Sequence, residues 1–187
     1  MLCNSGGAVG SDFYFEQECI KKGINVIAWS FPNHESNSKH RKILTINELN
    51  EGFEHIKIAN ETLGRNIYNI KPYVKFLLSR NWYQVKNSDA IFAIGNLQNR
   101  MGIKTQMRGG TAWACQEGID NNIPVYVFDQ NTNKWYEWCK GQEPCDKFIW
   151  LKDIPELTET FAGIGTRDIN ENGINAIKEL LKRKDNL

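Results

Sequence analysis

The stretch Leu2-Cys3-Asn4-Ser5-Gly6-Gly7-Ala8-Val9-Gly10-Ser11-Asp12 contains a short apolar run, a glycine-rich turn and the start of a helix. Glycine permits a sharp turn at the end of a strand, and the next helix directs its unpaired N–H groups at negative charge. The arrangement returns at Arg108-Gly109-Gly110-Thr111 and at Gly163-Ile164-Gly165-Thr166-Arg167. One such turn also ends strands for purely structural reasons, but three together predict a site for a nucleotide or a sugar phosphate.

Strand-like and helix-like stretches alternate along the rest of the chain. Continuous apolar runs are typical of strands that are covered on both faces, and they lie at 25–29, 90–95 and 124–128. Helical spacing is present at 12–22, 46–63, 74–84, 111–121 and after Asn170, which is placed to cap the last helix. The alternation predicts an α/β, Rossmann-like fold with an open, mostly parallel sheet, helices on both faces, and ligands bound beyond the C-terminal strand ends.

The length of 187 residues fits one domain, 1–187, with insertions expected near 31–63, 96–108 and 131–147. The composition of 96–108 indicates a loop or a short hairpin. Trp135 and its aromatic neighbours predict that 131–147 is a loop pinned to the body, with a base-stacking platform as the alternative. The basic cluster 39–42 is interpreted as a solvated loop, or alternatively as a mobile lid over a nucleotide.

Composition and charge exclude several classes of function. The 23 basic and 22 acidic residues nearly cancel, so no global field favours long nucleic acid as a partner. No apolar run approaches the roughly 20 residues that span a bilayer, and the N-terminus lacks the features of a secretory signal, so we expect a cytoplasmic protein without membrane contact. The five cysteines form no C-x-x-C pair and the three histidines show no metal-ligand spacing, so neither a metal nor a cofactor is expected.

The first turn resembles the S-G-G-A-x-G-x-D signature of the SLOG superfamily, Rossmann-like proteins that sense or process nucleotide-derived ligands. Members of that superfamily commonly begin with a strand that enters G-S-R or G-T-R, followed by a helix and then by the S-G-G-A strand. Here Gly165-Thr166-Arg167 and its helix come after everything else. The resemblance therefore implies a circularly permuted SLOG domain, whose first strand and helix have moved to the end of the chain.

A second match is to the LOG-type branch, phosphoribohydrolases that cleave the base from a nucleoside monophosphate. That branch has an arginine, an S/A-D-A strand start and the sequence P-G-G-x-G-T-x-x-E. Arg80 stands at the spacing of the catalytic arginine from Asp89-Ala90, and Gly109-Gly110 stands for the paired glycines. An insertion precedes Gly109, and Gln116 takes the place of the catalytic glutamate.

Gln116 weighs against hydrolysis, because a neutral amide stabilises an oxocarbenium-like species less well than a carboxylate does. An amide still suits a ribose hydroxyl or a base edge. If the protein is an enzyme, the resemblance makes Arg80 a catalytic candidate. The candidate acids are then Glu117, the neighbour of Gln116, and Asp12, although Asp12 also suits a helix cap. Arg80 and Arg167 are expected to contact phosphate rather than to form surface ion pairs.

The sequence thus predicts a protein that binds a nucleotide or a nucleotide-derived signal, of the cyclic nucleotide or ADP-ribose type, without turnover. Resemblance to SLOG proteins of nucleotide-signalled immunity makes a sensor or a sequestering sponge its concrete form. A nucleoside monophosphate N-glycosidase and a protein-interaction module are the alternatives, and a homo-oligomer is expected. Trp113 or Trp135 is expected to contact the base, and the predicted ligand-binding residues are Ser5, Gly6, Gly7, Ala8, Gly10, Ser11, Asp12, Arg80, Arg108, Gly109, Gly110, Thr111, Trp113, Gln116, Gly165, Thr166 and Arg167.

Overall fold

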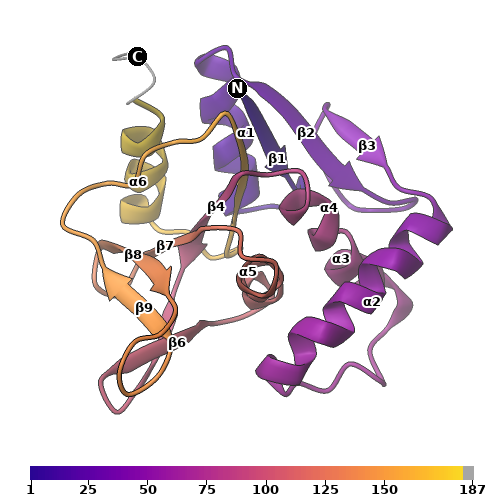
Figure 1. The fold of residues 1–187 in the computed structure, drawn as a ribbon. Helices are drawn as coiled ribbons and strands as arrows, with labels where there is room; N and C mark the ends of the chain where they lie inside the picture. Colours follow the sequence, from indigo (N-terminus) through magenta and orange to yellow (C-terminus); the bar gives the residue numbers. More distant parts are fainter. Residues whose placement is uncertain (183–187) are drawn as a thin grey trace.

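The computed structural model describes residues 1–182, in which a mixed, mostly parallel sheet lies between two layers of helices (Figure 1). Its strands are β1 (Leu2–Ser5), β2 (Asn25–Ser30), β3 (Arg41–Ile43), β4 (Ala90–Gly95), β7 (Val125–Asp129), β8 (Lys134–Cys139), β9 (Lys147–Trp150) and β10 (Thr160–Gly165). They are arranged in the order β3-β2-β1-β10-β4-β7-β8-β9. A separate antiparallel hairpin is formed by β5 (Leu97–Arg100) and β6 (Ile103–Met107).

The first and last strands of the described chain lie next to each other in the middle of this sheet. β1 pairs with β10 in parallel, with Leu2 opposite Thr160. The other side of β10 pairs in parallel with β4, where Phe161 is opposite Ala90. All pairs from β3 to β7 are parallel, and only β8 and β9 are antiparallel, at one edge. The predicted α/β fold with a mostly parallel sheet is therefore confirmed.

The helices cover both faces of the sheet, as the alternating pattern predicts. The helices on one face are α1 (Ser11–Lys21) and α6 (Glu171–Lys182), and those on the other are α2 (Ile46–Leu63), α3 (Pro72–Ser79), α4 (Asn81–Val85) and α5 (Thr111–Asp120). The end of α6 and the start of β1 lie at the same end of the molecule (Figure 1). Within residues 1–182, no helix has both the length and the apolar character needed to cross a bilayer.

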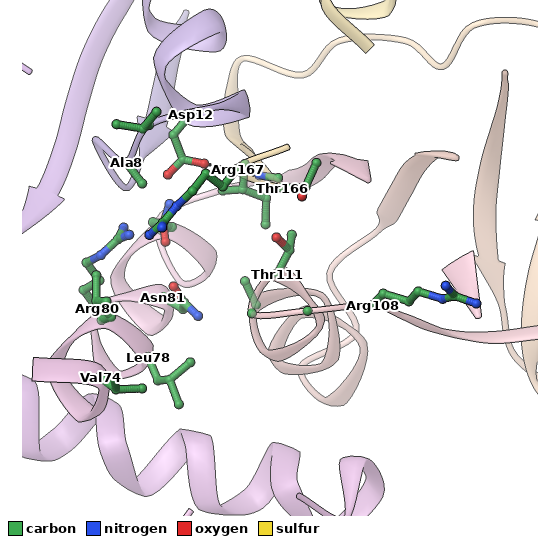
Figure 2. Close-up of a pocket in the computed structure, with 18 residues that line it drawn as sticks. Ala8, Asp12, Val74, Leu78, Arg80, Asn81, Arg108, Thr111, Thr166 and Arg167 are labelled. Carbon is green, nitrogen blue, oxygen red and sulfur yellow. Dashed lines mark hydrogen bonds between the residues drawn. The ribbon is translucent and has the colours of Figure 1, made fainter. Parts of the chain in front are cut away.

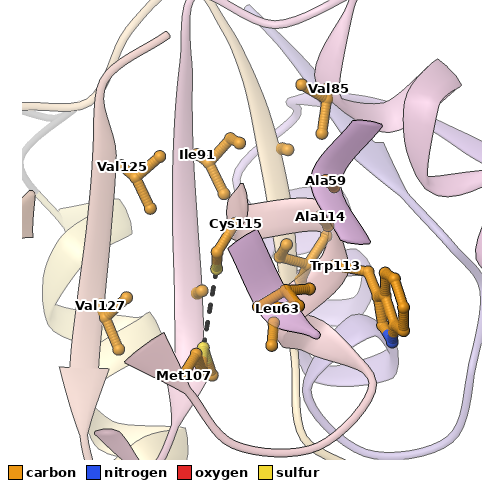
Figure 3. Packing of buried hydrophobic residues seen from close by; sticks show 14 of the residues in the cluster. Ala59, Leu63, Val85, Ile91, Met107, Trp113, Ala114, Cys115, Val125 and Val127 are labelled. Atoms are coloured by element: carbon orange, nitrogen blue, oxygen red, sulfur yellow. Dashed lines mark hydrogen bonds between the residues drawn. The ribbon is translucent and has the colours of Figure 1, made fainter. Parts of the chain in front are cut away.

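The apolar side chains of β4 alternate between two cores. Phe92 and Ile94 pack with α1 and α6, whereas Ile91 and Ala93 pack with α2 and α5. All four side chains are fully buried, which is what a strand covered on both faces requires. Figure 3 shows the second of these cores, where Cys115 Sγ lies 3.6 Å from the sulfur of Met107.

Two helices begin with the caps that their sequences favour. Thr45 precedes α2 and accepts a hydrogen bond from the backbone N–H of Glu48, whose carboxylate in turn accepts from the N–H of Thr45 at 2.7 Å. This reciprocal pair satisfies two N–H groups that the first turn of a helix leaves unpaired. Asn170 precedes α6 and accepts from the N–H of Gly173 at 2.9 Å, so its predicted role as a cap is confirmed.

The region 131–147 differs from its prediction as a loop, because it contains β8, a strand of the main sheet. A tight turn after Asp129, with Asn133 in the left-handed conformation, returns the chain antiparallel to β7. Trp135 and Tyr136 are buried against the sheet. Aromatic residues are common in strands, and here they belong to β8 rather than to a pinned loop.

Two smaller differences concern segment boundaries. The segment 74–84, predicted as one helix, is divided between α3 and α4 at Arg80. The basic cluster 39–42, predicted as a loop, contributes to the edge strand β3, whose three side chains are exposed. The predicted hairpin in 96–108 is confirmed as β5 and β6.

Candidate functional site

A cavity of about 380 Å³ lies at the carboxyl ends of the central strands, where open parallel sheets bind their ligands (Figure 2). The three glycine-rich turns predicted from the sequence all contribute to its lining, together with α3, α4 and α5. The lining residues are Ala8, Val9, Asp12, Val74, Leu77, Leu78, Arg80, Asn81, Gln84, Arg108, Gly109, Gly110, Thr111, Ala114, Ile164, Gly165, Thr166 and Arg167.

Arg80 is the buried cation of this cavity. Only 5% of its surface is exposed, and its Nε and Nη1 atoms have no hydrogen-bond partner within the described residues. Burial lowers the pKa of its guanidinium, while the nearby carboxylate of Asp12 raises it. The guanidinium lies against the Cα atom of Gly6, where any Cβ would overlap it. A buried charge with unpaired donors is costly, so this arrangement is suited to an anion that completes its hydrogen bonds.

Asp12 lies beside Arg80 and connects two of the turns. One carboxylate oxygen accepts from the N–H of Gly6 at 3.0 Å, and the other accepts from the N–H of Gly165 at 3.2 Å. The residue at the N-cap of α1 is Gly10, so Asp12 is a first-turn acid and not the cap. Burial raises the pKa of Asp12 to about 6, in spite of the opposing effect of Arg80.

The first glycine-rich turn is not an open anion cradle, because side chains of the protein already satisfy its donors. The N–H of Gly6 is bonded to Asp12, and the N–H of Gly7 donates to the hydroxyl of Ser5 at 3.0 Å. The N–H of Ser11 donates to the carbonyl of Thr166 at 3.0 Å. The carboxylate of Asp12 thus accepts a hydrogen bond from this turn where a ligand's phosphate was predicted to do so.

Acceptors within the protein also bind backbone N–H groups of the third glycine-rich turn. The N–H of Gly165 is bonded to Asp12, and the N–H of Thr166 donates to the carbonyl of Ile94 at 2.8 Å. The backbone of this turn also contacts the first turn, because a Cβ at Gly10 would lie 2.5 Å from the Cα of Arg167. The first and third turns therefore form one rigid unit around Asp12.

The second turn keeps its donors free. Among the described residues, the backbone N–H groups of Gly109, Gly110 and Thr111 have no hydrogen-bond partner. They stand at the start of α5, a helix of ten residues whose dipole places partial positive charge there. The hydroxyl of Thr111 has no partner in the described chain either. This turn has the chemistry of an anion cradle, and it borders the same cavity as Arg80.

Arg167 and Arg108 also line the cavity, and both are exposed. In Figure 2 the side chain of Arg167 extends toward Asp12, whereas that of Arg108 points away from the other labelled side chains. Arg167 is thus placed to add positive charge next to Arg80, and Arg108 lies at the periphery.

Gln116 and the two tryptophans predicted to contact the ligand lie elsewhere. The amide of Gln116 donates to Asp120 at 2.8 Å and lines a second cavity, of about 650 Å³, on the other side of α5. Trp113 is buried beneath Arg65, whose guanidinium lies 5.6 Å from the ring centre. Trp135 is buried in the core against Phe92 and Phe128. None of the three lines the cavity that contains Arg80.

The position of Gln116 changes how the LOG-type pattern fits this chain. If Gly110-Thr111 stands for the G-T of P-G-G-x-G-T-x-x-E, the glutamate position becomes Ala114. Ala114 lines the cavity, whereas Gln116 does not. In either alignment the position lacks a carboxylate.

Glu117, the substitute acid considered for a hydrolase, does not line the cavity either. It is 1% exposed, and neither of its carboxylate oxygens has a hydrogen-bond partner within the described residues. Burial raises its pKa well above the ordinary value, with the nearby charge of Asp120 adding to the effect. Asp12 is the one carboxylate among the described residues that line the cavity.

Eight lining residues were not predicted as ligand-binding from the sequence, and five of them share one side of the cavity. Val74, Leu77 and Leu78 of α3 form an aliphatic wall, and Asn81 and Gln84 of α4 add two amides. The amides had a signal in the sequence: they stand at positions i and i+3, on one face of a helical stretch that follows the apolar Phe76-Leu77-Leu78.

Metal binding and similarity to known proteins add no further constraint. Within residues 1–182, no group of three or more His, Cys, Asp and Glu side chains lies close enough to hold a metal ion. No protein family, curated protein or solved structure matches this chain.

Proposed function

We propose that the protein binds a nucleotide or a nucleotide-derived signalling molecule in the cavity around Arg80 and does not turn it over, so that it acts as a sensor or as a sequestering protein. The observation that carries this proposal is the guanidinium of Arg80, buried beside the cavity with two donor atoms unpaired. Native structures rarely leave such donors without a partner, and phosphate oxygens are suitable acceptors for them.

A second anion-binding element supports the proposal. Residues 109–111, whose backbone N–H groups are free, line the same cavity as Arg80, so we expect one ligand with several phosphate oxygens to contact both. The volume of about 380 Å³ lies within the range of small-molecule sites. The aliphatic wall formed by α3 gives the uncharged part of the ligand an apolar surface.

The proposed relationship to permuted SLOG domains is supported by the order of the strands. If the chain were read from β10 and the short edge strand β3 were left out, then β1, β2, β4 and β7 would follow, and their order in the sheet would be 3-2-1-4-5. That is the order of the doubly wound Rossmann arrangement, with the switch point between β10 and β4. The cavity lies at the carboxyl ends of these strands, as the same arrangement requires.

Binding without turnover is supported by the state of the carboxylates. Both oxygens of Asp12 hold backbone N–H groups, and Glu117 is buried away from the cavity. One observation favours the alternative, a nucleoside monophosphate N-glycosidase: the pKa of Asp12, raised to about 6, suits a general acid or base near neutral pH.

The test is to incubate the purified protein separately with AMP, a cyclic dinucleotide and ADP-ribose. Binding is measured by calorimetry, and the ligand recovered after heat denaturation is identified by chromatography. Arg80→Met removes the buried guanidinium, and Arg41→Met, an exposed arginine of β3 outside the cavity, is the matched control.

We expect intact ligand from the wild type and from Arg41→Met, and greatly weakened binding by Arg80→Met. Recovery of free base, abolished by Asp12→Asn, would establish the glycosidase instead. Absence of binding to all three compounds would refute a nucleotide site and favour a protein-interaction module.

A further inference from the structure

Two amide side chains face the cavity without an internal partner. Gln84 is 2% exposed and Asn81 is 9% exposed, and both line the cavity. Neither side-chain amide makes a hydrogen bond to the described residues, although every buried amide has donors and an acceptor to satisfy. Figure 2 shows the amide of Asn81 directed away from α4 into the space below Arg167 and Thr111.

We propose that Asn81 and Gln84 determine the specificity of this site by binding an uncharged group with neighbouring hydrogen-bond donors and acceptors, joined to the anion that Arg80 holds. This inference rests on the proposed function, because it assigns a second part of the same ligand. The chemistry in question is that of a sugar's vicinal hydroxyls or of a base edge.

The distribution of charge in the cavity separates the two parts of the ligand. Arg80, Arg167 and the start of α5 supply positive charge and N–H donors, which select an anion. The amides of Asn81 and Gln84 present carbonyl oxygens as well as donors, and a carbonyl oxygen repels a phosphate oxygen. An amide pair therefore belongs with a group that both donates and accepts.

The neighbouring side chains fit the same assignment. Leu77 and Leu78, which precede Arg80, border the cavity and form an aliphatic surface for the faces of a ring. Asn81 directly follows Arg80, and Gln84 lies about one helical turn farther along. The uncharged group is thus bound within about one helical turn, roughly 5 Å, of the residue that holds the anion.

The alternative is that these amides are only structural. A structural amide is expected to hydrogen-bond to the protein, as Asn60 does with both the N–H and the carbonyl of Arg65, each at 2.9 Å. Asn81 and Gln84 make no such bonds, so their replacement by apolar residues of similar shape is not expected to destabilise the protein.

The experiment measures dissociation constants of three probes: inorganic phosphate, ribose 5-phosphate and AMP. The variants are Asn81→Leu, Gln84→Met and their combination, and Gln98→Met in β5 is the matched control outside the cavity. The melting temperature of each ligand-free variant is recorded as well. The single variants provide the test if the combined one does not fold.

We expect the wild type to bind ribose 5-phosphate or AMP at least tenfold more tightly than phosphate. Each single substitution should lower that preference by about tenfold, and Gln98→Met should leave it unchanged. Loss of the preference for ribose 5-phosphate assigns the amides to the sugar, and loss confined to AMP assigns them to the base. Melting temperatures should not fall.

Two results would overturn the inference while leaving the proposed function intact. The first is a wild type that binds all three probes equally. The second is a preference that survives both substitutions. If the wild type binds none of the probes, the inference fails, and titration with the cyclic dinucleotide and ADP-ribose then decides separately whether the proposed function fails as well.

Discussion

Replacing Gly6 by alanine tests whether the position of Arg80 is what makes the cavity bind anions. The backbone at Gly6 does not adopt the left-handed conformation, so an alanine is compatible with it. Its Cβ, however, would overlap the guanidinium of Arg80 and lie 2.6 Å from the carboxylate of Asp12. The flexible arginine has to move, and its guanidinium then leaves the position from which we propose that it binds the anion.

The expected magnitude follows from the number of donors. A hydrogen bond to a charged group contributes about 1.5–3 kcal/mol, so the loss of two at the lower end costs about 3 kcal/mol, or roughly 150-fold in affinity. Arg80→Met removes the same donors directly. We expect Gly6→Ala and Arg80→Met each to weaken AMP binding by about this factor, and the double variant to bind no more weakly than Arg80→Met alone.

The assay is calorimetric titration with AMP at constant pH and salt, with circular dichroism to confirm that each variant is folded. Arg41→Met controls for the general loss of positive charge. Unchanged binding by Gly6→Ala, or losses that add up in the double variant, would show that the glycine and the arginine act independently and would refute this account.

Three further predictions concern stability, each measured by urea unfolding. The pKa of Asp12 is raised to about 6, against about 3.9 for an unperturbed aspartate. The contribution of Asp12 to the free energy of unfolding is therefore full below pH 4 and falls by about 3 kcal/mol as the pH rises to 7. Asp12→Asn should remove that fall, and an unchanged pH dependence in this variant would contradict the assignment. Gly10→Ala should lower the free energy of unfolding by about 3 kcal/mol, because φ at Gly10 is +100° and the new Cβ would lie 2.5 Å from the backbone of Thr166 and Arg167. A loss below about 1 kcal/mol would show that the first and third glycine-rich turns separate easily. Phe92→Ala should lower the free energy of unfolding by about 4 kcal/mol, since the ring is fully buried and packs against the ring of Phe161 in β10. A near-neutral result would rule out this packing of β4.

The layers of the fold were predictable because they depend on local periodicity. A run such as 90–95 is apolar at every position, which is the pattern of a strand between two helix layers, and that is where β4 lies. β8 was missed because its alternation is short and lies between polar turns. Its assignment depends on pairing with β7, a contact between segments that periodicity does not reveal.

The site was predictable at the level of its segments and not at the level of its atoms. All three glycine-rich turns reach the cavity, and so does Arg80. Which N–H groups remain free depends on Asp12, whose carboxylate satisfies donors 6 residues before it and 153 residues after it. The direction of Gln116 depends on how α5 is rotated against the sheet, and a motif alignment ambiguous by two positions does not specify that rotation.

The position of β10 between β1 and β4 has a consequence for the synthesis of the chain on the ribosome. When residues 1–130 have emerged, β1 and β4 are both available, but the strand that joins them has not yet been translated. Until 160–165 emerge, each of these two central strands presents an open edge that is able to pair with another chain. The centre of the sheet is therefore closed by a strand that is translated after both of its neighbours, and the nascent chain carries these two open edges until then.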